Sequence, residues 1–158
     1  MTVGLYDLYV NDRRLPYLQT VGEAELAGTG NCASPEAVAG LMNAAFSAGS
    51  LAEERLWMLA LDPRNQLKGI CEVAKGSPDS ACFTRVQIAQ RALLLGASAV
   101  IVCHCHPSGD PSPSEADKQT TGELKAVMQI LGIGFLDHII VAGANPGKFF
   151  SFSGAGML

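Results

Sequence analysis

The residues best suited to chemistry lie between positions 104 and 117. His104 and His106 follow a short apolar stretch, and Asp117 comes after a loop rich in Pro, Gly, Ser and Asp. If a strand persists through His106, both imidazoles project from one face of it, because side chains alternate along a strand. Two imidazole nitrogens and one carboxylate oxygen leave a fourth position open to water, which is typical of catalytic zinc. Such ligands also accept other divalent metals, so zinc is a preference.

Each part of this group also has a simpler interpretation. A His-x-His pair is by itself weak evidence of a metal site. Ser114 and Asp117 form Ser-x-x-Asp at a predicted helix start, a pattern that caps helices without any further role. Asp110 is interpreted as a turn former, and His138, inside an apolar strand, as a hydrogen-bonded structural histidine.

The elements that must position these residues indicate an α/β domain with a mixed central β-sheet flanked by helices. Strands are predicted at residues 4–10, 15–21, 54–62, 66–74, 98–103, 134–143 and 148–152. Helices are predicted at residues 34–46, 83–97 and 114–132. Residues 22–33 are Gly-rich and predict a loop. The strand at 54–62 is apolar on both alternating faces, so we expect the sheet to be covered on both sides.

Helix boundaries and periodicity support the helical segments. Ser34 can cap the first helix, and Pro35 suits its first position. Gly132 is typical of a helix end. Three apolar residues near helical spacing indicate the second helix: Val86, Ala89 and Leu93.

Length and composition restrict the class of protein. A chain of 158 residues suits one domain, and 48% hydrophobic with 16% charged residues indicates a globular fold. A net charge of −4 does not favour generic nucleic-acid binding. We find no membrane-spanning apolar stretch and no signal-peptide pattern, and therefore expect a cytoplasmic protein. The oligomeric state stays open, a homo-oligomer included.

The five cysteines show no disulfide framework, which predicts reduced thiols. They are Cys32, Cys71, Cys82, Cys103 and Cys105. A Cys-His nucleophile around His104 would lack an orienting partner. A zinc deaminase would need His-x-Glu and Pro-Cys-x-x-Cys, and neither is present.

The complete spacing resembles a known motif. His104-x-His106, seven residues, Ser114, two residues and Asp117 match the JAMM motif of the JAB/MPN metalloprotease-like family, and HCHPSGDPSPSEAD is similar to the hallmark of its RadC branch. The resemblance covers most of residues 15–156, including LPY, SPEAV, LALDPRNQL, LGIGFLDHIIVA and FFSFSGAG. It implies a cytidine-deaminase-like α/β fold. Residues 34–158 would be the RadC-like domain, and residues 1–33 its N-terminal strands and Gly-rich loop.

The resemblance also implies roles for individual residues. Three metal ligands carry over: His104, His106 and Asp117. Ser114 matches the serine that positions the water or steadies the oxyanion, and Glu54 matches the general base. Glu53 is the competing choice for the base, and only one of the two neighbours can point inward. The implied activity is metal-assisted hydrolysis of a peptide or isopeptide bond, although the sequence does not identify the substrate.

The chain also departs from the pattern of the family that it resembles. Cys105 stands where RadC-like chains usually have Asn, and we expect it to face away from the metal. Residues 83–86 are FTRV where HPRE is common, although Arg85 is kept. Longer RadC proteins carry an N-terminal helix-hairpin-helix region, whereas about 33 strand-like residues precede the first helix here, so nuclease-associated DNA repair is disfavoured. The alternative is a metal-bearing module that binds DNA-repair or mobile-element proteins without hydrolysis.

Overall fold

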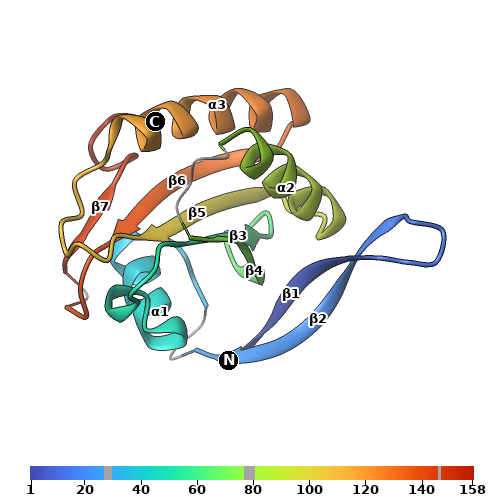
Figure 1. Cartoon of the computed structure of the whole chain (residues 1–158), viewed down its shortest axis with the longest axis horizontal. Coiled ribbons are helices and arrows are strands. Elements are labelled where there is room, and N and C mark those ends of the chain that lie inside the picture. The colour runs from blue at the N-terminus through green and yellow to red at the C-terminus, as the bar shows by residue number, and fades with distance from the viewer. Residues whose placement is uncertain (27–29, 77–80, 146) are drawn as a thin grey trace.

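Seven strands form one mixed sheet in the computed structural model, in the order β2-β1-β4-β3-β5-β6-β7 (Figure 1). The structure describes residues 1–26, 30–76, 81–145 and 147–158, with the backbone alone for 81–84. The strands are β1 Thr2–Val10, β2 Pro16–Glu25, β3 Arg55–Leu61, β4 Leu67–Lys75, β5 Ala99–Cys105, β6 Gly134–Val141 and β7 Phe149–Ser151. The pairs β1–β4 and β5–β6 are parallel, and the other neighbours are antiparallel. The single-domain α/β fold with a mixed sheet is therefore confirmed.

Helices cover both faces of this sheet. They are α1 Pro35–Phe46, the 3₁₀ helix η1 Ala48–Ser50, α2 Ala81–Leu94 and α3 Glu115–Leu131. Helix α1 packs on one face, and α2 and α3 pack on the other (Figure 1). Among the described residues, none of the helices is long and apolar enough to cross a membrane.

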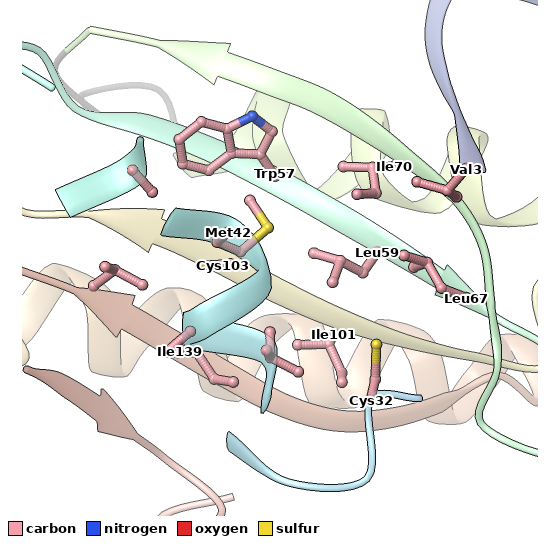
Figure 2. Packing of buried hydrophobic residues seen from close by; sticks show 14 of the residues in the cluster. Val3, Cys32, Met42, Trp57, Leu59, Leu67, Ile70, Ile101, Cys103 and Ile139 are labelled. Atoms are coloured by element: carbon pink, nitrogen blue, oxygen red, sulfur yellow. The ribbon is translucent and has the colours of Figure 1, made fainter. Parts of the chain in front are cut away.

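Alternation along the central strands divides the core into two layers. On β3, Trp57 and Leu59 face α1, whereas Met58 and Ala60 face α2 and α3. Figure 2 shows the α1 layer, in which Trp57 lies near Met42 of α1. The predicted strand with two covered faces is confirmed, because every residue from Trp57 to Leu61 is buried.

The helix starts and ends follow the predicted signals. Ser34 accepts a hydrogen bond from the backbone N–H of Ala37 at 3.2 Å and so caps α1, which begins at Pro35. Gly132 ends α3 with a φ of 70°, a left-handed conformation that glycine adopts without steric cost.

The face that α2 buries differs from the spacing that indicated the helix. Val86 and Leu93 are 56% and 55% exposed, whereas Ile88 and Ala92 are fully buried. Arg91 is also buried, because its guanidinium reaches Asp7 of β1 at 3.1 Å. The sheet beneath the helix, and not the count of apolar residues, selects the buried face.

Several predicted boundaries differ from the structure by a few residues; for example, α2 ends at Leu94 and β6 at Val141. Two further differences concern the Gly-rich segment and the strand that carries His104. Residues 22–25 belong to β2 and not to a Gly-rich loop, since β2 pairs with β1 as far as Glu25. Ala24 is buried between exposed Glu23 and Glu25, an alternation that suits an extended strand. Residues 27–29 of the same segment lie outside the described residues. Strand β5 continues two residues beyond Cys103 and therefore includes His104.

Candidate metal centre

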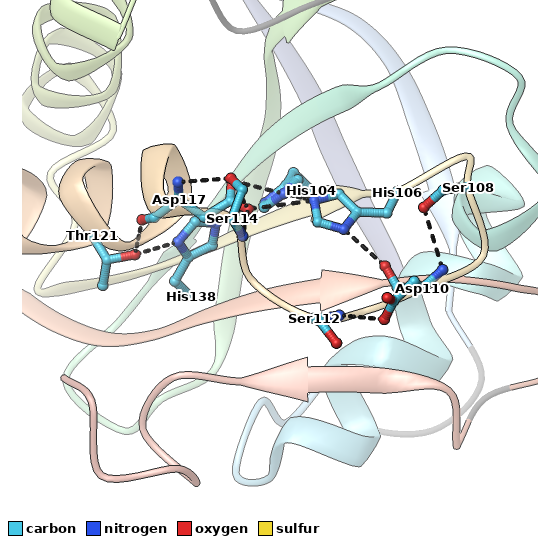
Figure 3. A network of polar contacts seen from close by, with 9 residues as sticks. All are labelled: His104, His106, Ser108, Asp110, Ser112, Ser114, Asp117, Thr121 and His138. Carbon is cyan, nitrogen blue, oxygen red and sulfur yellow. Dashed lines mark hydrogen bonds and ion pairs between the residues drawn. The ribbon is translucent and has the colours of Figure 1, made fainter.

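The two histidines lie at the carboxyl end of β5. His104 is inside the strand, and the backbone N–H of His106 donates to the carbonyl of Val141 at 2.9 Å. The hydrogen bonding between β5 and β6 therefore continues through His106. Under this condition, the alternation of side chains along a strand puts both imidazoles on one face. Asp117 approaches from the first turn of α3 (Figure 3).

The three predicted ligands converge on one point. The Nε2 atoms of His104 and His106 lie 2.8 Å apart. Asp117 brings Oδ1 to 3.2 Å from Nε2 of His104 and Oδ2 to 3.4 Å from Nε2 of His106. Ligands about 2.05 Å from a tetrahedral zinc stand roughly 3.3 Å from one another. These separations and donor types fit a divalent ion, so the group of three could hold one.

Asp117 is held in place by the cap of its own helix. Its Oδ2 accepts hydrogen bonds from the backbone N–H of Ser114 at 2.8 Å and from the hydroxyl of Ser114 at 2.7 Å. The backbone N–H of Asp117 donates in return to Ser114 Oγ at 3.1 Å, which completes a capping box. Capping therefore fixes the direction of the carboxylate that faces the histidines.

A turn in the following loop orients His106. Its Nδ1 lies 2.9 Å from the carbonyl oxygen of Asp110, which can only accept, so Nδ1 carries the hydrogen and Nε2 faces the site. The carboxylate of Asp110 accepts from the backbone N–H of Ser112 at 2.9 Å. Asp110 is thus a turn former, as the sequence predicts, and its carbonyl also holds a ligand.

His138 supports His104 from inside the core. Its Nε2 lies 2.8 Å from Nδ1 of His104, and its Nδ1 lies 2.7 Å from Oγ1 of Thr121 (Figure 3). His138 is a buried, hydrogen-bonded histidine, as expected, but sequence reasoning missed that its partner belongs to the site. The available signals were a histidine inside an apolar strand and a threonine one helical turn after Asp117.

Burial and hydrogen bonding shift the pKa values of these groups. Hydrogen bonding to Asp117 raises the pKa of His106 despite its partial burial. Burial alone would raise the pKa of Asp117, but the imidazoles of His104 and His106, which donate to its carboxylate when their Nε2 atoms are protonated, together with the hydroxyl of Ser114 outweigh burial and lower this pKa strongly. Full burial holds the pKa of His138 well below its usual value. The carboxylate is therefore ionised, and His138 is neutral.

The two candidate general bases have different surroundings. Glu53 is exposed and pairs with Lys75 Nζ at 3.2 Å. Glu54 is half-buried just before β3. Because Leu56 lies opposite His104 in the β3–β5 pairing, continuing this register places Glu54 opposite His106. The charge of Glu54 contributes to the raised pKa values of both His106 and Cys105, which indicates that its carboxylate lies near the site.

Cys105 belongs to the opposite layer of the core. Its side chain packs in the cluster under α1, and its thiol donates to the carbonyl of Glu53 at 3.5 Å. Burial raises its pKa, which keeps the thiol protonated. The group of three potential ligands does not include it. Like Cys32, Cys71 and Cys103, it is a free buried thiol, while the side chain of Cys82 lies outside the described residues.

The segment FTRV is only partly described. The backbone of residues 83–86 lies within the first half of α2, and Arg85 pairs with Glu123 of α3. Arg85 therefore joins the two helices on this face of the sheet.

Comparison with known proteins gives a family match over most of the chain. The model of the RadC-like JAB domain matches residues 32–157. A UPF0758 protein of Carboxydothermus hydrogenoformans is 38% identical over 125 residues, which are 79% of this chain and 53% of the relative. A UPF0758 protein of Clostridium beijerinckii is 35% identical over 125 residues, 79% of this chain and 52% of that protein. The chain spans about half the length of these curated relatives.

Proposed function

Because this chain belongs to the RadC-like JAB domain family, we propose that it is a metal-dependent hydrolase of peptide or isopeptide bonds. The observation that carries the proposal is the convergence of His104, His106 and Asp117 on one point, within 4.8 Å of one another. Three ligands of this kind leave a coordination position open, which suits catalysis better than a structural role.

The metal would be held by two imidazole nitrogens and one carboxylate oxygen, a donor set that favours zinc and accepts other divalent ions. A bound ion of this type lowers the pKa of water to about 7 and polarises a carbonyl group. Side chains of the protein would carry out the proton transfers and stabilise the oxyanion.

Glu54 is the proposed general base. It takes a proton from the attacking water and returns it to the leaving amine. Its support is the register that sets it opposite His106, together with the outward ion pair that Glu53 makes with Lys75. An exposed, paired carboxylate is poorly placed to reach a reacting water, and we therefore favour Glu54.

Ser114 is proposed to steady the oxyanion. The hydroxyl of Ser114 donates a hydrogen bond to Oδ2 of Asp117, and the backbone N–H of Ser114 donates to the same oxygen. Rotation of the hydroxyl toward a substrate oxygen would therefore leave Asp117 with one bond from the same residue. This arrangement lets one serine serve both the ligand and the developing negative charge.

The test is a screen of peptide and isopeptide libraries with zinc-loaded protein, followed by two matched variants. Glu54→Gln keeps size and hydrogen bonding but removes basicity, so hydrolysis should fall by about 10²–10⁴-fold with unchanged metal content. Glu53→Gln should remain near wild type. If Glu53→Gln is the inactive variant, Glu53 is the general base. If Glu54→Gln loses the metal, Glu54 is a metal ligand. If no library member is cleaved while partner binding persists in Glu54→Gln, the protein is a binding module and not a hydrolase.

A further inference from the structure

We infer that His138 is a positioning residue that fixes which ring nitrogen of His104 faces the metal site. The inference rests on the proposed metal site, but it concerns a chain of hydrogen bonds within the protein. This chain of hydrogen bonds runs from the backbone of Asp117 through Thr121 and His138 to His104 (Figure 3).

Thr121 determines the direction of this chain. Its hydroxyl lies 2.7 Å from the backbone carbonyl oxygen of Asp117, an atom that can only accept a hydrogen bond. A hydroxyl has a single hydrogen to donate, and this contact uses it. The second contact of Thr121 Oγ1, at 2.7 Å from Nδ1 of His138, must therefore be one in which Nδ1 donates.

The direction of the hydrogen bond at His138 determines the direction of the one at His104. It is only 1% exposed, and its partners Thr121 and His104 carry no negative charge, so an imidazolium there would be costly. With its hydrogen on Nδ1, a neutral His138 has a bare Nε2. That atom lies 2.8 Å from Nδ1 of His104 and can only accept, so His104 must carry its hydrogen on Nδ1.

The consequence for the site is that neutral His104 carries its hydrogen on Nδ1, so that its bare nitrogen is Nε2, the atom that lies beside His106 and Asp117. The opposite tautomer would place a hydrogen on Nε2, where the metal must bind. It would also require Thr121 to give up its bond to Asp117. These buried hydrogen bonds thus fix the tautomer of His104 in the metal-free protein, as partners of metal-binding histidines commonly do.

The experiment is long-range ¹H–¹⁵N NMR of the imidazole rings in the metal-free chain of 158 residues. The chain has only three histidines, so each ring can be assigned by single substitution. We expect the hydrogen on Nδ1 in both His104 and His138. A hydrogen on Nε2 of neutral His104 would overturn the inference.

Variants of Thr121 test the direction of the chain. Thr121→Val removes both contacts at nearly constant volume, and the Nε2–H form of His104 should appear in its spectrum. Zinc affinity, measured by titration, should fall by about tenfold, at the low end of the 10–100-fold typical for such partners. Thr120→Val on the same helix is the matched control and should bind as wild type does. A wild-type tautomer or a wild-type affinity in Thr121→Val would overturn the inference.

If Thr121→Val fails to fold, a second pair of variants tests the same inference. In His138→Gln, the amide oxygen can still accept from Nδ1 of His104, whereas His138→Leu offers no acceptor. Zinc affinity should be rescued in His138→Gln relative to His138→Leu, and equal affinities would contradict the role of His138. These readouts need no substrate. If the protein binds zinc with the expected tautomers but hydrolyses nothing, the proposed function fails and this inference stands.

Discussion

The hydroxyl of Ser114 lies 2.7 Å from Oδ2 of Asp117, so the residue that caps α3 also holds the carboxylate facing the two histidines. The positive end of the helix dipole lies at the same turn and favours an ionised Asp117. Helix stability and ligand position therefore depend on one side chain.

Replacing Ser114 should affect both properties. Ser114→Ala should lower the free energy of unfolding by about 0.5–2 kcal/mol, the usual cost of losing an N-cap. Zinc affinity should fall by about tenfold, because Asp117 keeps only the bond from the backbone N–H. Denaturant unfolding and zinc titration measure the two effects. Ser112→Ala is the control, since Ser112 bonds Asp110 through its backbone N–H. Equal stabilities of the two variants would contradict the capping role.

Cys105 should be dispensable for metal binding. Its thiol lies in the layer under α1 and bonds the carbonyl of Glu53, on the opposite face of β5 from His104. Cys105→Ser retains a donor for that carbonyl, so metal content by elemental analysis should equal that of wild type. Loss of metal in this variant would make Cys105 a ligand and would indicate a mixed Cys/His site.

The metal-free site should give a defined pH dependence. The pKa of His106 is raised in the folded protein by Asp117, so the ion pair stabilises the fold below the unfolded pKa of about 6.5. This contribution is lost as pH rises through the folded-state pKa. Metal binding needs the neutral imidazole, so zinc affinity should increase with pH over the same range and then level off.

Thermal unfolding of metal-free protein between about pH 5.5 and pH 8.5 measures the stability effect. Asp117→Asn removes the ion pair, and its stability should change less over this range than that of wild type. Parallel pH profiles for the two proteins would show that His106 and Asp117 do not form the pair. The rise of zinc affinity with pH is followed separately, by titration of wild type.

Residues close together in the sequence were the most predictable part of the site. The His-x-His spacing at a strand end and the Ser-x-x-Asp at a helix start each depend on local geometry. The structure brings His104, His106 and Asp117 together. The loop between them could be interpreted because Asp110 forms its turn within a few residues.

Contacts between distant segments were not predictable in the same way. His138 is 34 residues from His104, and their contact depends on β6 lying beside β5. Arg91 is buried because Asp7, 84 residues earlier, lies beside it, and no local pattern in α2 carries that information. Apolar spacing indicates that a helix exists, but the neighbouring strands select its buried face.

The most direct test of the metal centre is elemental analysis of protein purified without chelator or added metal. We predict about one divalent ion per chain, with zinc preferred, because the three ligand atoms already lie at separations that suit such an ion. The double variant His104→Ala/His106→Ala should contain almost none. Equal metal content in wild type and the double variant would contradict the site and, with it, the proposed hydrolase.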